Sequence, residues 1–173
     1  PTGNTIGPDG ALYIGEYTGF PYLEGAARIF RIGENGVPEV FAEGFTHITD
    51  LTFDQNGNLL VLQFSDEPQP LDDIRFLPGS LIQLAPDGTR TTLVAAGEGL
   101  ESSAGITIGP NNEIYVTRRG VGPELGSVVR VDLEPAATVP EPSSTVGLLA
   151  FSVLGGGFLL KRQGKRSKDD SKN

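Results

Sequence analysis

A short pattern of a β-prone run, a tight turn and a second β-prone run occurs three times in this chain. The copies occupy residues 2–15, 49–62 and 104–117 and read TGNTIGPDGALYIG, TDLTFDQNGNLLVL and AGITIGPNNEIYVT. The turns Pro-Asp-Gly, Gln-Asn-Gly and Pro-Asn-Asn contain residues that tolerate positive φ and join antiparallel strands. The equivalent turn positions are Gly10, Gly57 and Asn112. A hairpin repeated about every 50 residues predicts a fold built from repeated β units.

Each copy is followed by further β-prone runs. A third run recurs as Ala27–Ile32, Ser80–Leu84 and Ser127–Val131, and a fourth run occurs as Glu39–Ala42 and Thr91–Ala95. The chain holds 24 Gly and 13 Pro, a turn-rich composition, and no helical periodicity separates the runs. Four short antiparallel strands per unit predict an all-β chain made of β-propeller blades. A β-sandwich or β-solenoid with accidental similarity is the alternative.

The predicted blades cover about residues 1–45, 46–97 and 98–134, so that about three blades form a body over 1–134. The third unit lacks a fourth β-prone run, because Asp132–Pro135 leads directly into the C-terminal segment. Closed rings need about four blades or more, and the last blade is often completed by a strand from the other end of the chain. Because position 1 is not Met, we expect the chain to be a fragment, the C-terminal half of a larger propeller.

Net charge divides the chain into an acidic body and a basic tail. Residues 1–134 hold seven Arg, no Lys and nineteen acidic residues, whereas residues 135–173 hold six Lys or Arg and three acidic residues. An acidic body excludes nucleic acid as a partner, because phosphate contacts require Lys and Arg. The absence of Cys excludes disulfide scaffolds, zinc ribbons and thiol nucleophiles, and a single His excludes His-rich metal sites within this chain.

The tail contains an uncharged stretch over residues 142–160, followed directly by basic residues. A helix of that length reaches about 28 Å, close to the hydrocarbon thickness of about 30 Å. We therefore predict a linker over 135–141, one short transmembrane helix over 142–160 and a basic cytoplasmic tail over 161–173. A buried core helix is the alternative, although such a helix seldom ends in a cluster of cations. The predicted orientation places the body outside the cytoplasmic membrane.

Three features of the tail stand in a recognisable order: the motif Pro140-Glu141-Pro142, the apolar stretch, and the pair Lys161-Arg162. Over about residues 139–166 the tail resembles the PEP-CTERM sorting signal, and its amino-acid sequence is most similar to cyanobacterial members. The resemblance implies that an exosortase, a membrane-embedded enzyme, recognises the segment. It also implies an exported protein that is first anchored in the membrane and is periplasmic, outer-surface or extracellular after processing. The two prolines keep the motif extended and therefore accessible.

Three segments of the body carry a second resemblance: Gly7–Ile14, Glu16–Pro21 and Gly25–Ile29. Through them, residues 1–134 resemble the ScyD/ScyE family of scytonemin-biosynthesis-associated proteins. Members of that family are exported propellers related to NHL-repeat proteins, and some carry the same tail. The resemblance implies an accessory role associated with the scytonemin pathway.

In a propeller, the connections between second and third strands gather on one face around the channel, where ligands usually bind. Here these connections are long: Glu16–Gly25, Ser65–Gly79 and Arg118–Gly126. The hairpins expected on the opposite face are minimal. Long loops on a rigid scaffold therefore predict a ligand-binding face at this end of the blades.

Eight side chains are candidate ligand-face residues: His47, Asp50, Asp66, Glu67, Asp72, Asp73, Arg118 and Arg119. His47 beside Asp50 would serve as a base or ligand at the channel mouth, and a structural histidine fits the same pattern. The four carboxylates of one loop would offer oxygen ligands to Ca²⁺, but they lack the spacing of a known calcium loop, which favours a solvated acidic loop. The two arginines would hold an anionic ligand or form a strand-end charge pair.

Two functions fit these features. The first is an exported, membrane-anchored accessory protein that binds a small-molecule or protein ligand, with no cofactor and with Ca²⁺ left open. The second is a propeller hydrolase or oxidoreductase of the lactonase or glucose-dehydrogenase type, with a metal held at the channel. Such an enzyme needs polar ligands from several blades, and the predicted inner positions offer Asp50 alone. The sequence contains no defensible Ser-His-Asp set, phosphate loop or pair of catalytic acids, so it favours the accessory protein.

Overall fold

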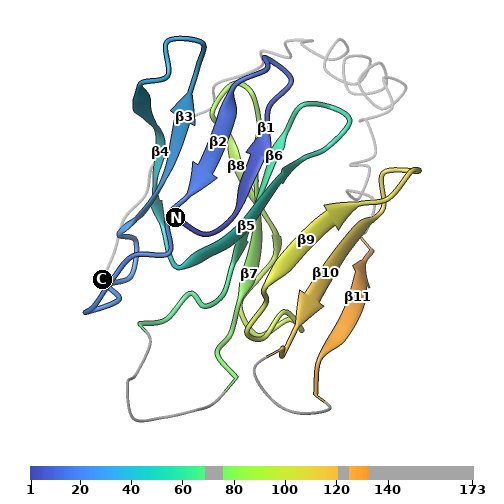
Figure 1. Cartoon of the computed structure of the whole chain (residues 1–173). Helices are drawn as coiled ribbons and strands as arrows, with labels where there is room; N and C mark the ends of the chain where they lie inside the picture. Colours follow the sequence, from blue (N-terminus) through green and yellow to red (C-terminus); the bar gives the residue numbers. More distant parts are fainter. Residues whose placement is uncertain (69–75, 121–124, 133–173) are drawn as a thin grey trace, which may run out of the picture. The chain divides into compact units, whose positions relative to one another are not determined.

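The computed structural model describes residues 1–68, 76–120 and 125–132 (Figure 1). These residues form eleven β-strands and no helix, which confirms the all-β prediction for the body. No helix in this described part is long and apolar enough to cross a membrane. The predicted linker, the 142–160 span and the basic tail lie outside the described residues.

The strands form three antiparallel sheets, each from one consecutive stretch of chain. The first sheet contains β1 (Asn4–Ile6), β2 (Leu12–Gly15), β3 (Ala27–Ile32) and β4 (Pro38–Phe45), in that order. The second contains β5 (Ile48–Phe53), β6 (Leu59–Gln63), β7 (Ser80–Leu84) and β8 (Arg90–Val94), in that order. The third has, among the described residues, β9 (Gly105–Ile108), β10 (Ile114–Arg118) and β11 (Ser127–Val131).

The three repeated turns have the backbone that their sequences predict. Gly10, Gly57 and Asn112 have φ values of 76°, 79° and 66°, and each closes the hairpin between the first two strands of its sheet. The predicted third strands match β3, β7 and β11, whereas β4 is longer than the predicted run Glu39–Ala42. Register shifts in the pairing of β3 with β4 let this strand continue to Phe45, which pairs with Ala27.

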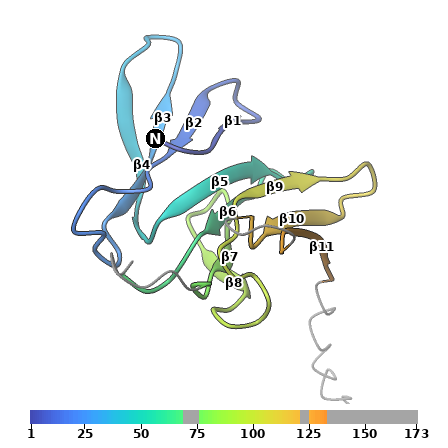
Figure 2. The same ribbon diagram turned by 60° about the horizontal axis from the view of Figure 1, so that its bottom comes forward.

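The first strands of the three sheets lie in series, with β5 beside both β1 and β9 (Figure 2). Two side chains connect them. The Thr2 hydroxyl donates a hydrogen bond to the Ile48 carbonyl, and Oδ2 of Asp50 accepts one of 2.9 Å from the Ile106 N–H. Neighbouring sheets are therefore tied together along their inner strands.

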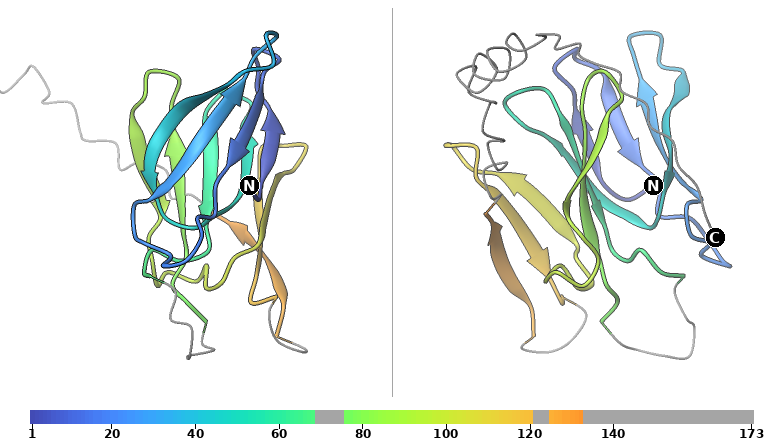
Figure 3. Two further views of the ribbon diagram at one scale, coloured as in Figure 1. Left: turned by 60° about the vertical axis from the view of Figure 1, so that its left-hand side comes forward. Right: turned by 180° about the vertical axis from the view of Figure 1, so that it is seen from behind.

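Apolar side chains fill the spaces between successive sheets, which lie one after another in the right-hand view of Figure 3. β6 is buried along its whole length, and its side chains pack into both of the spaces between sheets. Leu59 and Val61 pack against the first sheet, whereas Leu60 and Leu62 pack against the third. This alternation is the period of two expected for a strand covered on both faces.

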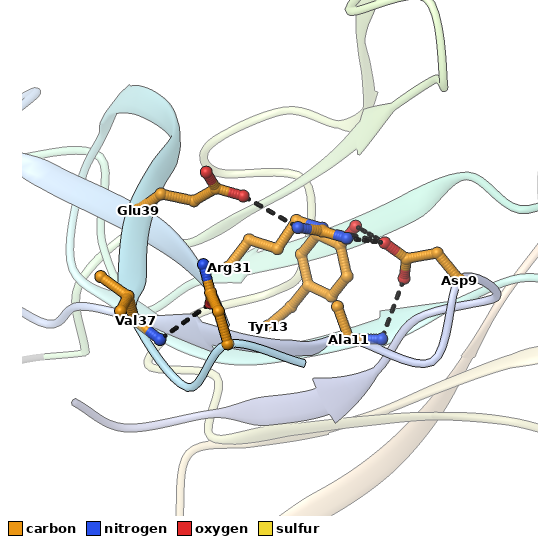
Figure 4. Close-up of polar contacts among 7 residues, drawn as sticks. Asp9, Ala11, Tyr13, Arg31, Val37 and Glu39 are labelled. Atoms are coloured by element: carbon orange, nitrogen blue, oxygen red, sulfur yellow. Dashed lines mark hydrogen bonds and ion pairs between the residues drawn. The ribbon is translucent and has the colours of Figure 1, made fainter. Parts of the chain in front are cut away.

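An ion-pair cluster ties the hairpin end of the first sheet together (Figure 4). Arg31 donates hydrogen bonds of 2.9 and 2.7 Å to Asp9 and one of 2.8 Å to Glu39. The Tyr13 hydroxyl donates to the same Asp9 carboxylate. The Arg31 side chain hydrogen-bonds Asp9, and this outweighs desolvation and holds the pKa of Asp9 below its usual value. Tyr13 and Arg31 are paired in register on the two central strands β2 and β3, and Glu39 lies on β4, so the cluster ties these three strands together.

Candidate functional site

The long connections meet at the end of the sheets opposite the hairpins, the lower end in Figure 1. The connections β2–β3, β6–β7 and β10–β11 leave from this end, and so do the sheet-to-sheet connections β4–β5 and β8–β9. We call this the loop face. The loop face is defined by the described residues alone, and residues 69–75 and 121–124 lie outside them.

His47 lies in the β4–β5 connection and is fully buried. Its ring centroid is 5.1 Å from the Tyr17 ring at an interplanar angle of 31°, and 6.0 Å from the Tyr22 ring. Phe64 completes this aromatic cluster, with its ring 6.0 Å from that of Tyr17. The sequence predicts this histidine at the channel mouth, and the structure surrounds it with rings from the first and second loops.

The imidazole of His47 is held in its neutral form. Burial lowers its pKa below 6.5, although backbone groups of Tyr22 and Ser65 partly oppose that effect. Within the described residues, neither ring nitrogen makes a hydrogen bond of normal geometry. Burial likewise raises the pKa of Tyr17 to about 12, with a smaller contribution from Tyr22. A neutral imidazole can donate from one nitrogen and accept at the other, and the nearby backbone groups of Tyr22 and Ser65 are its polar neighbours.

The equivalent position in the third repeat is Ser102, and both residues have a φ of 46°. The Ser102 hydroxyl accepts a hydrogen bond of 3.0 Å from the Leu77 N–H, while its own N–H donates to the Leu77 carbonyl. The repeat therefore fixes the backbone at this position and leaves the side chain free to differ. In the second repeat that side chain is the histidine.

Asp50, the predicted neighbour of His47, faces the backbone instead. Its Oδ1 accepts a hydrogen bond of 2.9 Å from the Leu51 N–H, and its Oδ2 accepts the cross-sheet bond from Ile106. The carboxylate is not hydrogen-bonded to the His47 ring. The structure thus places the two residues in separate environments, with Asp50 linking inner strands.

A buried amide at the end of β6 connects three segments of the loop face. Gln63 Oε1 accepts a hydrogen bond of 2.7 Å from the Thr46 N–H, and its Nε2 donates to Asp66 at 2.7 Å and to Ser80 at 3.0 Å. The Ser80 hydroxyl also donates to Asp66 at 2.6 Å. The Thr46 hydroxyl accepts from the Gly25 N–H at 2.9 Å, which extends the network to the first loop.

The acidic loop is described only in part. Asp66 is engaged by the Gln63 network, and the backbone N–H of Glu67 donates to the Ser65 hydroxyl at 2.9 Å. Asp72 and Asp73 lie outside the described residues. Within the ranges that the structure describes, no three Asp, Glu or His side chains group closely enough to hold a metal ion. The absence of bound Ca²⁺ stays a prediction.

Arg118 and Arg119 share one carboxylate. Glu101 Oε2 lies 3.1 Å from a guanidinium nitrogen of each, and Arg118 also donates to the Gly99 carbonyl at 2.6 Å. Arg119 stacks over the Phe76 ring at 5.4 Å. Burial alone would raise the pKa of Glu101, but its backbone hydrogen bond and the two arginines lower it. The ion-pair partner of these arginines is therefore Glu101, a residue that the sequence analysis did not identify.

Sequence reasoning missed Tyr17, Tyr22, Gln63 and Glu101. A signal for Gln63 was available, because it is a lone amide in the apolar run of β6 and burial of an amide requires partners. The two tyrosines lie in the first predicted loop, but nothing local shows that their rings would enclose His47.

The tail matches a known family of sorting motifs. Residues 138–163 match the PEP-CTERM protein-sorting motif, which confirms the resemblance of the tail to that signal. The motif marks an exported protein that is recognised by an exosortase-type enzyme, anchored in the membrane and then processed. No curated protein matches the chain.

Solved structures resemble the body in fold. A structure described as that of a gluconolactonase is 18% identical, with a TM-score of 0.54, over 78% of this chain and 45% of that one. Virginiamycin B lyase from Staphylococcus aureus is 16% identical, with a TM-score of 0.46, over 78% of this chain and 42% of that one. The chain thus spans less than half of each solved chain. Because the gluconolactonase is a propeller-type protein, the fold of the body is propeller-like.

Proposed function

We propose that the chain is an exported, surface-associated binding or accessory protein of the ScyD/ScyE type, whose body presents its loop face to a ligand. The sorting motif at 138–163 carries the proposal, because it marks an exported protein that is anchored in the membrane and then processed by an exosortase-type enzyme. The body joined to it is propeller-like and positions long loops on a sheet scaffold. The ScyD/ScyE assignment rests on the three segments that resemble that family.

The geometry of the loop face supports binding more than catalysis. Asp50, the acidic candidate at the inner positions, uses both carboxylate oxygens on backbone N–H groups. The two arginines share the single carboxylate of Glu101, which offsets one of their two charges, and no carboxylate of the described residues hydrogen-bonds the His47 ring. These side chains therefore make contacts within the body: Asp50 links neighbouring strands, the arginines pair with Glu101, and His47 packs against aromatic rings. A lactonase-type enzyme would need a different set of convergent groups.

Processing of the tail tests the proposal. In a host with an exosortase, the wild-type chain should be exported, and mass analysis of its C-terminus should show loss of the basic residues. The variant with Pro140, Glu141 and Pro142 all changed to Ala should stay full-length at the membrane, since the enzyme has lost its motif. Glu134→Ala lies outside the matched residues and should be processed normally. Full-length wild-type protein in the soluble cytoplasmic fraction would contradict the proposal.

A further inference from the structure

The sequence holds two Asn-Gly pairs, and each closes a hairpin. Asn35-Gly36 lies in the turn between β3 and β4, and Asn56-Gly57 lies in the turn between β5 and β6. Both asparagines are exposed, and the two glycines have positive φ values of 69° and 79°. At such a pair the backbone nitrogen of the glycine can attack the asparagine carboxamide, because glycine has no Cβ to hinder the approach. The local chemistry of the two pairs is the same, so the fold decides which one reacts.

Hydrogen bonds to the third sheet hold the Asn56-Gly57 turn. The Gln55 N–H donates to Asn112 Oδ1 at 3.3 Å, and Gln55 Nε2 donates to the Pro110 carbonyl at 3.4 Å. Within the turn, the Asp54 carboxylate accepts a hydrogen bond of 2.9 Å from the Asn56 N–H. Attack on the Asn56 carboxamide requires the backbone to rearrange, so these contacts oppose it.

The Asn35-Gly36 turn has no comparable support. Among the described residues, its hydrogen bonds stay within the turn. The Gly36 N–H donates to the Gly33 carbonyl at 3.0 Å, and the Val37 N–H donates to the asparagine Oδ1 at 3.0 Å. A Cβ on Gly36 would meet nothing within 4 Å, so the glycine stands clear of other segments. The Gly57 N–H makes the same kind of turn bond, at 3.1 Å, so that bond does not distinguish the two pairs.

The Asn35 carboxamide is folded back against the peptide group whose nitrogen would attack it. The hydrogen bond between Asn35 Oδ1 and the Val37 N–H closes a ring that contains the Asn35–Gly36 peptide group. A hydrogen bond donated to Oδ1 also draws electrons away from Cγ, which makes that carbon more susceptible to a nucleophile. Asn35 lines an open polar groove of about 450 Å³ together with Asp9 and Glu39, and this groove gives water access to the turn.

We propose that Asn35 is the site at which the folded body deamidates. The Gly36 nitrogen loses its proton and bonds to Asn35 Cγ, the carboxamide C–N bond breaks, and ammonia leaves, which gives a cyclic succinimide. Water then adds to either ring carbonyl and breaks its bond to the ring nitrogen, which gives aspartate or isoaspartate. The reaction consumes water, releases ammonia and needs no oxidant or enzyme, so it advances with the age of the protein.

Isoaspartate changes the hairpin that it closes. Its main chain passes through the former side chain, so the turn between the Gly33 carbonyl and the Gly36 N–H gains one carbon. That turn follows Ile32, which pairs with Pro38 where β4 begins. We expect amide hydrogen exchange along β4 to be faster in the isolated isoaspartate form than in wild type. Asn35→Asp adds the same charge without the extra carbon and should exchange like wild type. Equal exchange in all three forms would overturn this part of the proposal.

Peptide mass analysis of the full-length protein tests the site. The protein is kept at mildly alkaline pH in mild detergent, and samples are digested at acidic pH into fragments that separate the two pairs. In the folded protein Asn35 should deamidate roughly tenfold faster than Asn56, because the Asn56 turn must first break its hydrogen bonds to the third sheet. In guanidinium chloride the two should react at similar rates. Equal or faster reaction at Asn56 in the folded protein would overturn the proposal, and so would the same ratio of rates in the folded and unfolded chains.

Release of the protected turn gives an independent readout. Asn112→Gly removes the acceptor of the Gln55 N–H but keeps a residue that tolerates positive φ, and Gln55→Ala removes the second hydrogen bond. In the double variant Asn56 should react faster and approach the rate of Asn35, whereas the rate of Asn35 should stay unchanged. Circular dichroism that matches wild type shows that the double variant folds. An unchanged rate at Asn56 in the folded double variant would overturn the proposal.

Discussion

His47 combines a left-handed backbone, complete burial and an imidazole whose nitrogens make no regular hydrogen bond within the described residues. Burial favours the neutral form of this side chain, because its charged form would lose solvation within the aromatic cluster. Its pKa is lowered relative to 6.5, so the unfolded chain binds more protons near that pH than the folded chain does.

We therefore expect the body to lose stability as pH falls from about 7.5 through the lowered pKa of His47. The stabilisation is complete above the unfolded value of 6.5. The variant His47→Ser carries the residue type found at the equivalent position, Ser102. Its melting temperature should change less with pH over the same interval than that of the wild type. Carboxylates with lowered pKa values, such as Glu101, titrate at lower pH and therefore do not contribute to the change in stability over this interval. Equal slopes in thermal melts of the two proteins would contradict the account.

Asp50 gives the second prediction for a single residue. Asp50→Ala leaves the Ile106 N–H without its cross-sheet acceptor and should lower the free energy of unfolding by about 1–3 kcal/mol. Glu34→Ala, in the exposed Gly33–Gly36 turn, is the control and should change it by less than about 0.5 kcal/mol. Urea denaturation of the full chain in mild detergent measures both. Matching midpoints would show that the cross-sheet bond carries no stability.

Residue-level prediction from the sequence succeeded where the chemistry is local and failed where it is not. Gly10, Gly57 and Asn112 were recognised as turn residues because positive φ is a property of the residue itself. The burial of His47 depends on Tyr17 and Tyr22, which lie 30 and 25 positions earlier in the chain. No local pattern encodes that contact.

Elements follow the sequence closely, because alternation and turn chemistry define a strand. β3, β7 and β11 have the predicted bounds, whereas β4 runs further because its bulged pairing with β3 depends on both strands. How closely neighbouring first strands approach could not be predicted from periodicity. The sequence shows Gly3 only as a small residue at the start of the repeat, but a Cβ there would lie 2.3 Å from the Cα of Asp50.

Gly3→Ala should therefore force β1 away from β5, since backbone atoms cannot yield as a flexible side chain can. We expect a loss of about 1–3 kcal/mol in the free energy of unfolding, the usual cost of overpacking. Gly19→Ala is the matched control, because a Cβ at Gly19 meets nothing within 4 Å. If both variants unfold at the same denaturant concentration, the close approach of the two inner strands is wrong.

At the scale of the whole molecule, the chain joins a propeller-like body to a sorting tail. Repeat spacing predicted the stacked sheets, and the order of motif, apolar stretch and basic pair predicted the tail. The ligand could not be derived, because loop side chains such as those around His47 are arranged by packing between sheets rather than by a local motif. The number of blades in the complete ring and the ScyD/ScyE assignment stay predictions.

The central claim, that the tail anchors a body that lies outside the cytoplasmic membrane, is tested most directly by labelling two single-cysteine variants in a host without exosortase. Leu23→Cys reports on the loop face of the body, and Ser171→Cys reports on the basic tail. In intact spheroplasts, a membrane-impermeant maleimide should label the Leu23→Cys variant fully and the Ser171→Cys variant only after lysis, because the basic cluster stays in the cytoplasm. Labelling of the Leu23→Cys variant only after lysis would contradict the account.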